Sequence, residues 1–438
     1  MTKAKVRNAA EDIEKATMRC ITWRLLPYLM LSYFIAYVDR VNVGFAALTM
    51  KDIGLSESVF GFGASMFFIA YVLFEIPSNL ALQKVGARLW VARIMISWGI
   101  VGMATSLVVG PYSFYLARFL LGAAEAGFFP GVILYLTYWF PRAYRARIIA
   151  TFMVAIPVSN FLGSPLSALL LEMDGVAGLS GWQWLFLVES VPAVILGLLA
   201  LRILTKSPAE ADWLAPEQRA WLQHRLATEA SAETLTKPSL WTLARNGQVW
   251  LFAVIYCGSS ATSNALSLWQ PQILKSFNLT TLQTGLLNMI PFGLASLFMI
   301  LWGIRADQKA ERMWATALPL ALTSLSLFLT LATDSLSLTL VLLSLVLIGN
   351  YAVKGPFWAL VTERLPASIV AASVAAINTF AHLGTGGASA LLGIIRERTG
   401  SFALALTPLA VLTAAGALTV LYIGRRRQSE LSQSMQST

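Results

Sequence analysis

Long apolar stretches alternate with short polar ones along the whole chain. Each apolar stretch runs for roughly 20 residues, the length that an α-helix needs to cross the hydrocarbon core of a bilayer. Six of these stretches precede a polar interval at 206–245, and six follow it. The pattern therefore predicts twelve membrane-spanning helices, at about 25–48, 57–82, 89–109, 112–139, 146–171, 183–205, 247–272, 281–303, 314–332, 338–361, 368–395 and 402–424.

The composition indicates a protein that is embedded in a lipid bilayer. Of the 438 residues, 57% are hydrophobic and 12% are charged, whereas soluble domains carry about 25% charged residues. The first ~20 residues are polar, so we expect no cleavable signal sequence. We expect an all-α membrane fold of two pseudo-symmetric six-helix bundles. The N-terminal bundle with its tail occupies 1–205, a cytoplasmic central loop occupies 206–245, and the C-terminal bundle with its tail occupies 246–438.

Lysines and arginines concentrate in alternate loops. The two tails and the loops after even-numbered spans hold 25 of the 32 lysines and arginines, and the other loops hold four. Cytoplasmic loops carry such an excess, so we expect a multi-pass protein of the cytoplasmic (inner) membrane with both termini in the cytoplasm. The net charge of +10 then reflects these loops rather than a nucleic-acid partner. We expect no metal and no cofactor, since the sequence has neither zinc-ligand spacing nor a Gly-rich phosphate loop.

The two halves of the chain resemble each other. The segment NLALQKVGAR at 79–88 aligns with GIRADQKAER at 303–312, and PRAYRA at 141–146 aligns with PASIVA at 366–371. The two offsets, 303 − 79 = 224 and 366 − 141 = 225, are almost equal. The match indicates a duplicated six-helix unit, and parallel repeats of this kind place a substrate site between the halves near the bilayer midplane.

Three cations and several acids lie inside apolar stretches. A charge at membrane depth costs a few kcal/mol or more, so such side chains usually face a protein interior or a water-filled cavity. Arg118 and Glu125 are seven residues apart and project from one helix face, as do Tyr37 and Arg40 with Tyr33. We expect these faces to line a polar cavity. A buried structural ion pair is the alternative.

Several motifs now support a family resemblance. The loop at 79–88 resembles the signature of the major facilitator superfamily with Gly86 and Arg88 in register, although Asn79 and Gln83 depart from it. Within that superfamily the chain resembles the anion:cation symporter branch, and above all its tartrate, phthalate and sugar-acid permeases. The resemblance implies import of a carboxylate-bearing anion together with protons. It is carried by YVDRVNVGFAAL (37–48), FEIPSNL (74–80), the segment 118–141, WQWLFLVESVPAVILG (182–197) and KGPFWAL (354–360).

The charged residues of the first half suggest a mechanism. A guanidinium grips a carboxylate through two parallel hydrogen bonds, so we expect Arg40 and Arg118 to bind the substrate. Asp39 and Glu125 are the acids best placed for proton coupling, and the resemblance implies this role for both. We expect Glu125 to pair with Arg118 and to release it on protonation. A structural salt bridge remains the alternative for each acid.

Further substrate contacts are expected from both halves. Lys354 is the one cation well inside the second half, where it either binds a carboxylate or extends toward the membrane surface. Asn378 and His382 face one way on the eleventh span, and His382 stands where related permeases usually have Asn. Packing is the alternative for the histidine and for the aromatic residues. These further candidates are Tyr37, Tyr71, Lys354, Trp358, Asn378 and His382.

Other classes of function receive less support. A sodium-coupled carrier or a uniporter fits the same residues, and a membrane sensor would need a signalling domain for which the tails and the central interval are too short. The chain has only two histidines and no HExxH or GxSxG motif, so we expect no enzyme. The segment NFLGSPLS at 160–167 lacks the glycine pair of the antiporter signature, which argues against drug export. We expect a monomer whose partners are a small organic anion, protons and lipid.

Overall fold

The computed structural model describes residues 3–231, 245–309 and 311–436. Within these ranges all regular secondary structure is helical. The first half contains α1 (Lys3–Ala46), α2 (Glu57–Val85), α3 (Ala87–Ala104), α4 (Pro111–Glu125), α5 (Phe128–Thr137), α6 (Arg142–Met153), α7 (Ala155–Leu171) and α8 (Gly181–Ile203). The central interval contains α9 (Pro216–Ser231). The second half contains α11 (Gly247–Lys275), α12 (Thr281–Lys309), α13 (Arg312–Leu329), α14 (Leu336–Ala352), α15 (Lys354–Arg364), α16 (Ala367–Thr399) and α17 (Phe402–Gln436). Short 3-10 helices occupy Met50–Ile53, Thr105–Leu107, Val176–Gly178, Pro208–Glu210 and Thr330–Ala332.

The helices confirm the predicted all-α membrane fold. In the part of the chain that the structure describes, eleven spans are long and apolar enough to cross a bilayer. Three of these spans are interrupted helices, made of α4 with α5, α6 with α7, and α14 with α15. The predicted span at 368–395 corresponds to α16, which has 33 residues but is not one of the eleven. Its middle, INTFAHLGTGGASA, consists largely of small and polar residues.

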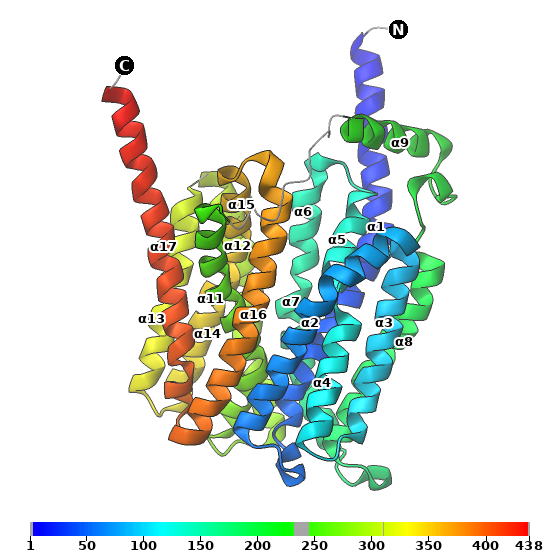
Figure 1. Ribbon diagram of the computed structural model, residues 1–438. Helices are drawn as coiled ribbons and strands as arrows, with labels where there is room; N and C mark the ends of the chain where they lie inside the picture. The colour runs from blue at the N-terminus through cyan, green and yellow to red at the C-terminus, as the bar shows by residue number, and fades with distance from the viewer. Residues whose placement is uncertain (1–2, 232–244, 310, 437–438) are drawn as a thin grey trace.

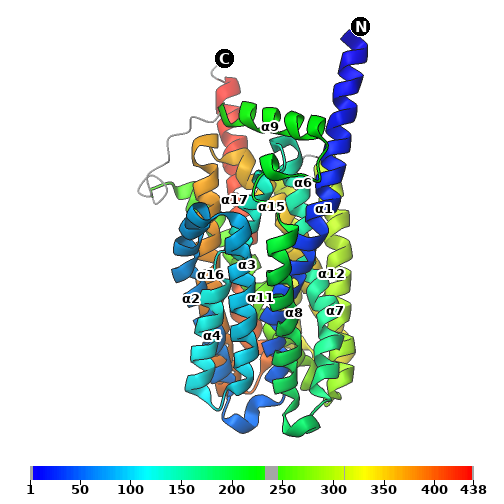
Figure 2. The same ribbon diagram turned by 90° about the vertical axis from the view of Figure 1, so that its right-hand side faces the viewer.

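The helices form two bundles side by side (Figure 1). In the first, α3 packs against α8 and α1 against α7; in the second, α13 packs against α17 and α11 against α16. The bundles meet along α2 with α16, α7 with α12, and α1 with α11. Both chain termini and α9 lie at the same end of the molecule (Figures 1 and 2). We call this the termini end, and the opposite end the far end.

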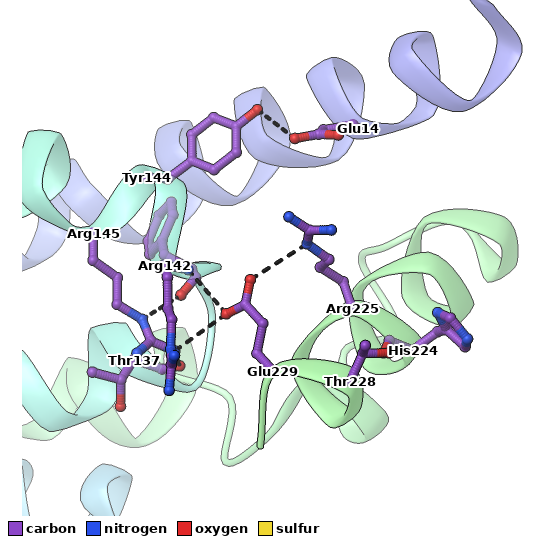
Figure 3. A network of polar contacts seen from close by, with 10 residues as sticks. Glu14, Thr137, Arg142, Tyr144, Arg145, His224, Arg225, Thr228 and Glu229 are labelled. Carbon is purple, nitrogen blue, oxygen red and sulfur yellow. Dashed lines mark hydrogen bonds and ion pairs between the residues drawn. The ribbon is translucent and has the colours of Figure 1, made fainter. Parts of the chain in front are cut away.

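Helix α9 is tied to the first bundle by polar contacts (Figure 3). The Glu229 carboxylate lies 3.3 Å from Arg225 Nε on α9 and 3.9 Å from Arg145 on α6. Nearby, the Tyr144 hydroxyl donates a hydrogen bond of 2.8 Å to Glu14 on α1. These contacts join α1, α6 and α9, so the central interval is anchored to the first bundle on this side.

The two bundles are in close contact at the far end. Ser56 Oγ and the backbone N–H of Ser58, at the start of α2, donate hydrogen bonds of 2.9 and 2.7 Å to Glu397 Oε2 on α16. One turn further along α2, a Cβ added to Gly61 would lie 2.6 Å from the Ser389 carbonyl oxygen. Glycine at this crossing lets the two backbones approach, as small residues do between membrane helices.

Candidate functional site

Two related spans are interrupted beside a charged residue. In the fourth span, α4 ends at Glu125 and α5 begins at Phe128; Gly127 between them has φ +86°. A Cβ at this position would lie 2.3 Å from Ser78 Oγ, so both the backbone conformation and the space require glycine. In the tenth span, α14 and α15 are separated by Val353, directly before Lys354. Interrupted helices at corresponding positions of two repeats are a pointer to a transporter's binding site.

The first interruption positions a buried ion pair. Arg40 of α1 donates a hydrogen bond to Glu125 of α4, and the two residues are only 7% and 3% exposed. The guanidinium carbon of Arg40 also lies 4.8 Å from the ring centroid of Tyr37 and 5.6 Å from that of Tyr71. Arg40 Nε has no hydrogen-bond partner. The ring centroid of Phe67 lies 5.2 Å from the guanidinium carbon. The arginine is therefore held by one carboxylate and three aromatic rings, with donor capacity left over.

Arg40 lies on the wall of a cavity between the bundles. The cavity has a volume of about 50 Å³, which is room for a few water molecules. Each half of the chain contributes seven lining residues. The first half supplies a mainly aromatic and apolar wall with one cation: Tyr33, Tyr37, Arg40, Tyr71, Phe129, Met153 and Ile156. The second half supplies a mainly polar wall with one cation: Tyr256, Ser260, Ser263, Asn264, Lys354, Asn378 and His382.

The cavity lies on the termini side of the contacts that join the bundles. Along α1, which runs toward the far end, Arg40 lines the cavity, and a Cβ on the later Gly44 would lie 2.5 Å from the Leu268 carbonyl oxygen. Along α16, His382 lines the cavity, and the carbonyl of the later Gly386 accepts a 2.5 Å hydrogen bond from Ser65. On α2, α7 and α11 the lining residues likewise lie nearer the termini end than the contacts that Ser65, Ser164 and Leu268 make with the other bundle. The described conformation is therefore packed together on the far side of the cavity.

Most of the predicted substrate contacts come together at this cavity. Two do not line it. Arg118 is 1% exposed, and its guanidinium carbon lies 4.9 Å from the ring centroid of Phe67. Trp358 lies one layer behind the wall, with its ring centroid 4.8 Å from that of Tyr256. The predicted residues that do line the cavity are Tyr37, Arg40, Tyr71, Lys354, Asn378 and His382.

The partner of Glu125 differs from the expectation. The spacing of Arg118 and Glu125 led us to expect a pair between them, but the ion pair of Glu125 is with Arg40. Seven residues of α-helix rise about 10.5 Å, so two side chains on one face at this spacing lie at different depths. Arg40, on another helix at the depth of Glu125, reaches the carboxylate instead. The predicted pairing was therefore wrong, and neither Arg118 nor Glu125 is among the residues that line the cavity.

Asp39 points away from the cavity. Trp98 Nε1 on α3 and Ser190 Oγ on α8 donate hydrogen bonds of 2.9 and 3.0 Å to its carboxyl oxygens. The residue is 4% exposed and is not part of the cavity wall. Neighbouring residues on a helix are separated by about 100°, so Arg40 can face the cavity while Asp39 faces the interior of the first bundle.

Sequence reasoning missed the polar face of α11. Ser260, Ser263 and Asn264 line the cavity beside Tyr256. They recur at the helical spacing of three and four residues within an otherwise apolar span, and this periodicity is the signal that could have found them. Neutral hydroxyl and amide groups cost less in a membrane than full charges, so the same sequence also suits simple packing.

Comparison with known proteins gives relatives along nearly the whole chain. A protein of Agrobacterium vitis named "Putative tartrate transporter" is 45% identical over 415 residues, which cover 94% of this chain and 96% of the relative. A "Quinolone resistance transporter" of Acinetobacter baumannii is 36% identical over 427 residues, covering 97% of this chain and 98% of the relative. Both relatives are named as transporters, and neither name describes an enzyme.

A solved structure has the same fold. A bacterial homolog of the human lysosomal transporter Spinster, in an inward-facing and occupied conformation, superposes with a TM-score of 0.73 at 14% identity. The match covers 92% of this chain and 96% of that one. The family model described as Major Facilitator Superfamily matches residues 29–389. With this model spanning both bundles and the cavity between them, the chain belongs to the Major Facilitator Superfamily and is a membrane transporter, not an enzyme.

Proposed function

We propose that this secondary transporter imports a small organic acid anion together with protons across the inner membrane. The observation that carries the proposal is the buried ion pair that Glu125 forms with Arg40, the cation on the first bundle's wall of the cavity. The relative named for tartrate supports a hydroxy acid as the substrate. The lysine and arginine excess supports a cytoplasmic termini end, so the described conformation would have its cavity on the cytoplasmic side.

In this mechanism, Glu125 and the substrate compete for Arg40. A substrate carboxylate needs the same guanidinium donors that Glu125 occupies. A proton on Glu125 removes its negative charge and weakens its hold on Arg40, so protonation makes the arginine available to the anion. Proton binding and anion binding therefore assist each other, and this mutual assistance is the coupling that a symporter needs.

Arg118 and Asp39 act away from the cavity in this proposal. Arg118 lies two helical turns nearer the far end than Glu125, with its guanidinium carbon 4.9 Å from the ring centroid of Phe67 on α2. It would contact the anion when the far end opens. Asp39 is the second proton carrier. Its hydrogen bonds to Trp98 and Ser190 tie α1 to α3 and α8, so its protonation would change how α1 is held and would act on Arg40 through the helix.

The test is transport in liposomes with a matched pair of variants. We expect wild-type protein to accumulate labelled tartrate when an inward proton gradient is imposed, and to lose accumulation when a protonophore collapses the gradient. Glu125→Gln keeps a neutral side chain at this position. It should retain tartrate exchange but lose proton-driven accumulation. The control is Glu189→Gln, at a buried acid that is hydrogen-bonded by Ser167 at 2.7 Å, and it should still accumulate tartrate.

The outcomes separate the alternatives. Accumulation that persists without a proton gradient and requires sodium would identify a sodium-coupled carrier and refute proton coupling. Equilibration without accumulation under either gradient would identify a uniporter. Loss of both exchange and accumulation in Glu125→Gln, with the protein still folded, would mean that the acid holds the site together and does not carry the proton.

A second candidate function is export of aromatic acids. The relative named for quinolone resistance favours it, and so does the aromatic wall formed by Tyr33, Tyr37 and Tyr71. Loading the liposomes with an aromatic carboxylate and imposing the same gradient distinguishes the two directions. Proton-driven efflux without proton-driven tartrate uptake would favour export.

A further inference from the structure

Lys354 is a buried cation without a counter-charge. It is 6% exposed, and its Nζ lies 3.4 Å from Ser263 Oγ and 4.3 Å from the ring centroid of Tyr351. Across residues 3–231, 245–309 and 311–436, no carboxylate forms an ion pair with it. An ammonium has three donors, and one long hydrogen bond to a neutral hydroxyl leaves most of them unused. A buried charge in this state calls for an anion.

The two cations of the cavity therefore differ. Arg40, on the first bundle, already has the Glu125 carboxylate as its partner, whereas Lys354, on the second bundle, has no carboxylate partner among the described residues. With Glu125 ionised, the group formed by Arg40, Lys354 and Glu125 carries a net charge of +1. With Glu125 protonated, the same group carries +2. A substrate with two negative charges neutralises the protonated site, and a substrate with one leaves a buried positive charge uncompensated.

The two cations also face the same space from opposite sides. Arg40 and Lys354 both line the cavity, and each belongs to a different bundle. Lys354 is the first residue of α15, directly after the interruption of the tenth span. The interruption of the fourth span lies beside Glu125, the partner of Arg40. One anion held by both cations would be attached to α1 of the first bundle and to α15 of the second, and so to both moving units of an alternating-access transporter.

We infer that Lys354 binds a second carboxylate of the substrate, so that the preferred cargo is a small dicarboxylate bridging the two bundles. This inference rests on the proposed function, because it assumes that Arg40 receives the first carboxylate. Ser260, Asn264 and His382 on the wall between them offer partners for hydroxyl groups of the cargo. His382 Nδ1 is buried without a hydrogen-bond partner. A hydroxy-dicarboxylate carries one carboxylate for each cation and hydroxyl groups for these side chains.

Two matched anions test the inference. Tartrate carries two carboxylates, and threonate has the same carbon chain and inner hydroxyls with one carboxylate replaced by CH₂OH. The dissociation constants of both are measured by calorimetry on the purified full-length protein. We compare wild type with Lys354→Met, which removes the charge at similar length, and Lys354→Arg, which keeps it. Lys275→Met, at a lysine outside the cavity wall, is the control.

The expected result is a loss of selectivity. Wild type should prefer tartrate to threonate, and Lys354→Met should weaken tartrate binding about 10- to 100-fold, as expected for one charge-assisted contact. Its affinity for threonate should change less than about threefold on the same grounds. Lys354→Arg should keep a preference for tartrate and Lys275→Met should match wild type. Retained tartrate binding in the Arg variant shows that the site itself is intact.

Contrary results would refute either the inferred dicarboxylate site or the proposed function itself. If Lys354→Met leaves the affinity for tartrate unchanged, or weakens the affinities for tartrate and threonate by the same factor, Lys354 does not bind a second carboxylate. If wild type binds both anions equally, the dicarboxylate preference is wrong while organic-acid transport stands. If wild type binds neither anion nor any other carboxylate, the proposed function itself fails.

Discussion

The contact between Glu397 and the start of α2 should stabilise the closed far end. Its carboxylate accepts two hydrogen bonds from the other bundle, at 2.9 Å from Ser56 Oγ and 2.7 Å from Ser58 N. These groups are near the surface, so each bond contributes about 0.5–1 kcal/mol. Glu397→Ala removes both. We therefore expect the ratio of far-end-open to far-end-closed molecules to rise about 5- to 30-fold, the factor that corresponds to 1–2 kcal/mol.

Spin-label distances between the bundles measure this ratio. Labels placed at Asp52, before α2, and at Arg398, near the end of α16, report the opening of the far end. The native Cys20 and Cys257, both free thiols, are replaced first. The longer distance should gain population in Glu397→Ala.

A neighbouring acid supplies the control. Glu57 also lies in the first turn of α2, but it pairs at 3.4 Å with Lys51 of its own bundle. Glu57→Ala should therefore leave the distance distribution as in wild type. Equal distributions in wild type and Glu397→Ala would refute the reasoning, as would an equal shift in Glu57→Ala.

The same contact has a defined pH dependence. Hydrogen bonds from Ser58 and Ser56 lower the pKa of Glu397 below its usual range, because they stabilise the ionised carboxylate. The contribution to closure is therefore fully present above the pKa of the open state and is lost as pH falls through the lower pKa of the closed state. At neutral pH the wild type should stay closed, and it should approach the Glu397→Ala distribution only at acid pH.

Three further predictions concern the rest of the molecule. Gly127→Ala should destabilise the protein by about 1–3 kcal/mol, because alanine is strained at φ +86° and its Cβ would meet Ser78. Thermal melting should show this as a lower melting temperature. The control Gly355→Ala, with open space at its Cβ, should not lower the melting temperature. Asp39→Asn should fold normally but lose proton-driven accumulation in the liposome assay, and full accumulation would remove Asp39 from the coupling mechanism. Glu229→Gln should cost at most about 1 kcal/mol in thermal stability, because its arginine partners are partly exposed; a larger loss would mean that α9 is needed for the bundle to form.

The membrane-spanning helices were largely predictable from sequence, and so were six of the fourteen residues of the cavity wall. Hydropathy locates a span because a bilayer requires about 20 apolar residues, and helical periodicity identifies the face on which a charge lies. These two rules explain why Arg40, Lys354 and His382 were expected to face a shared interior, as they do. The cost of a charge in lipid excludes the outward orientation.

Partners and depths were decided only by the tertiary structure. The Glu125 carboxylate pairs with Arg40 and not with Arg118, because the packing of α1 against α4 brings the two groups to one depth in the membrane. The rotation and offset between two helices cannot be derived from residue spacing along one of them. Asp39 faces Trp98 and Ser190 because α3 and α8 pack on that side of α1. Local sequence determines which helices form and which faces are polar, and the packing of helices distant in the chain determines which groups meet.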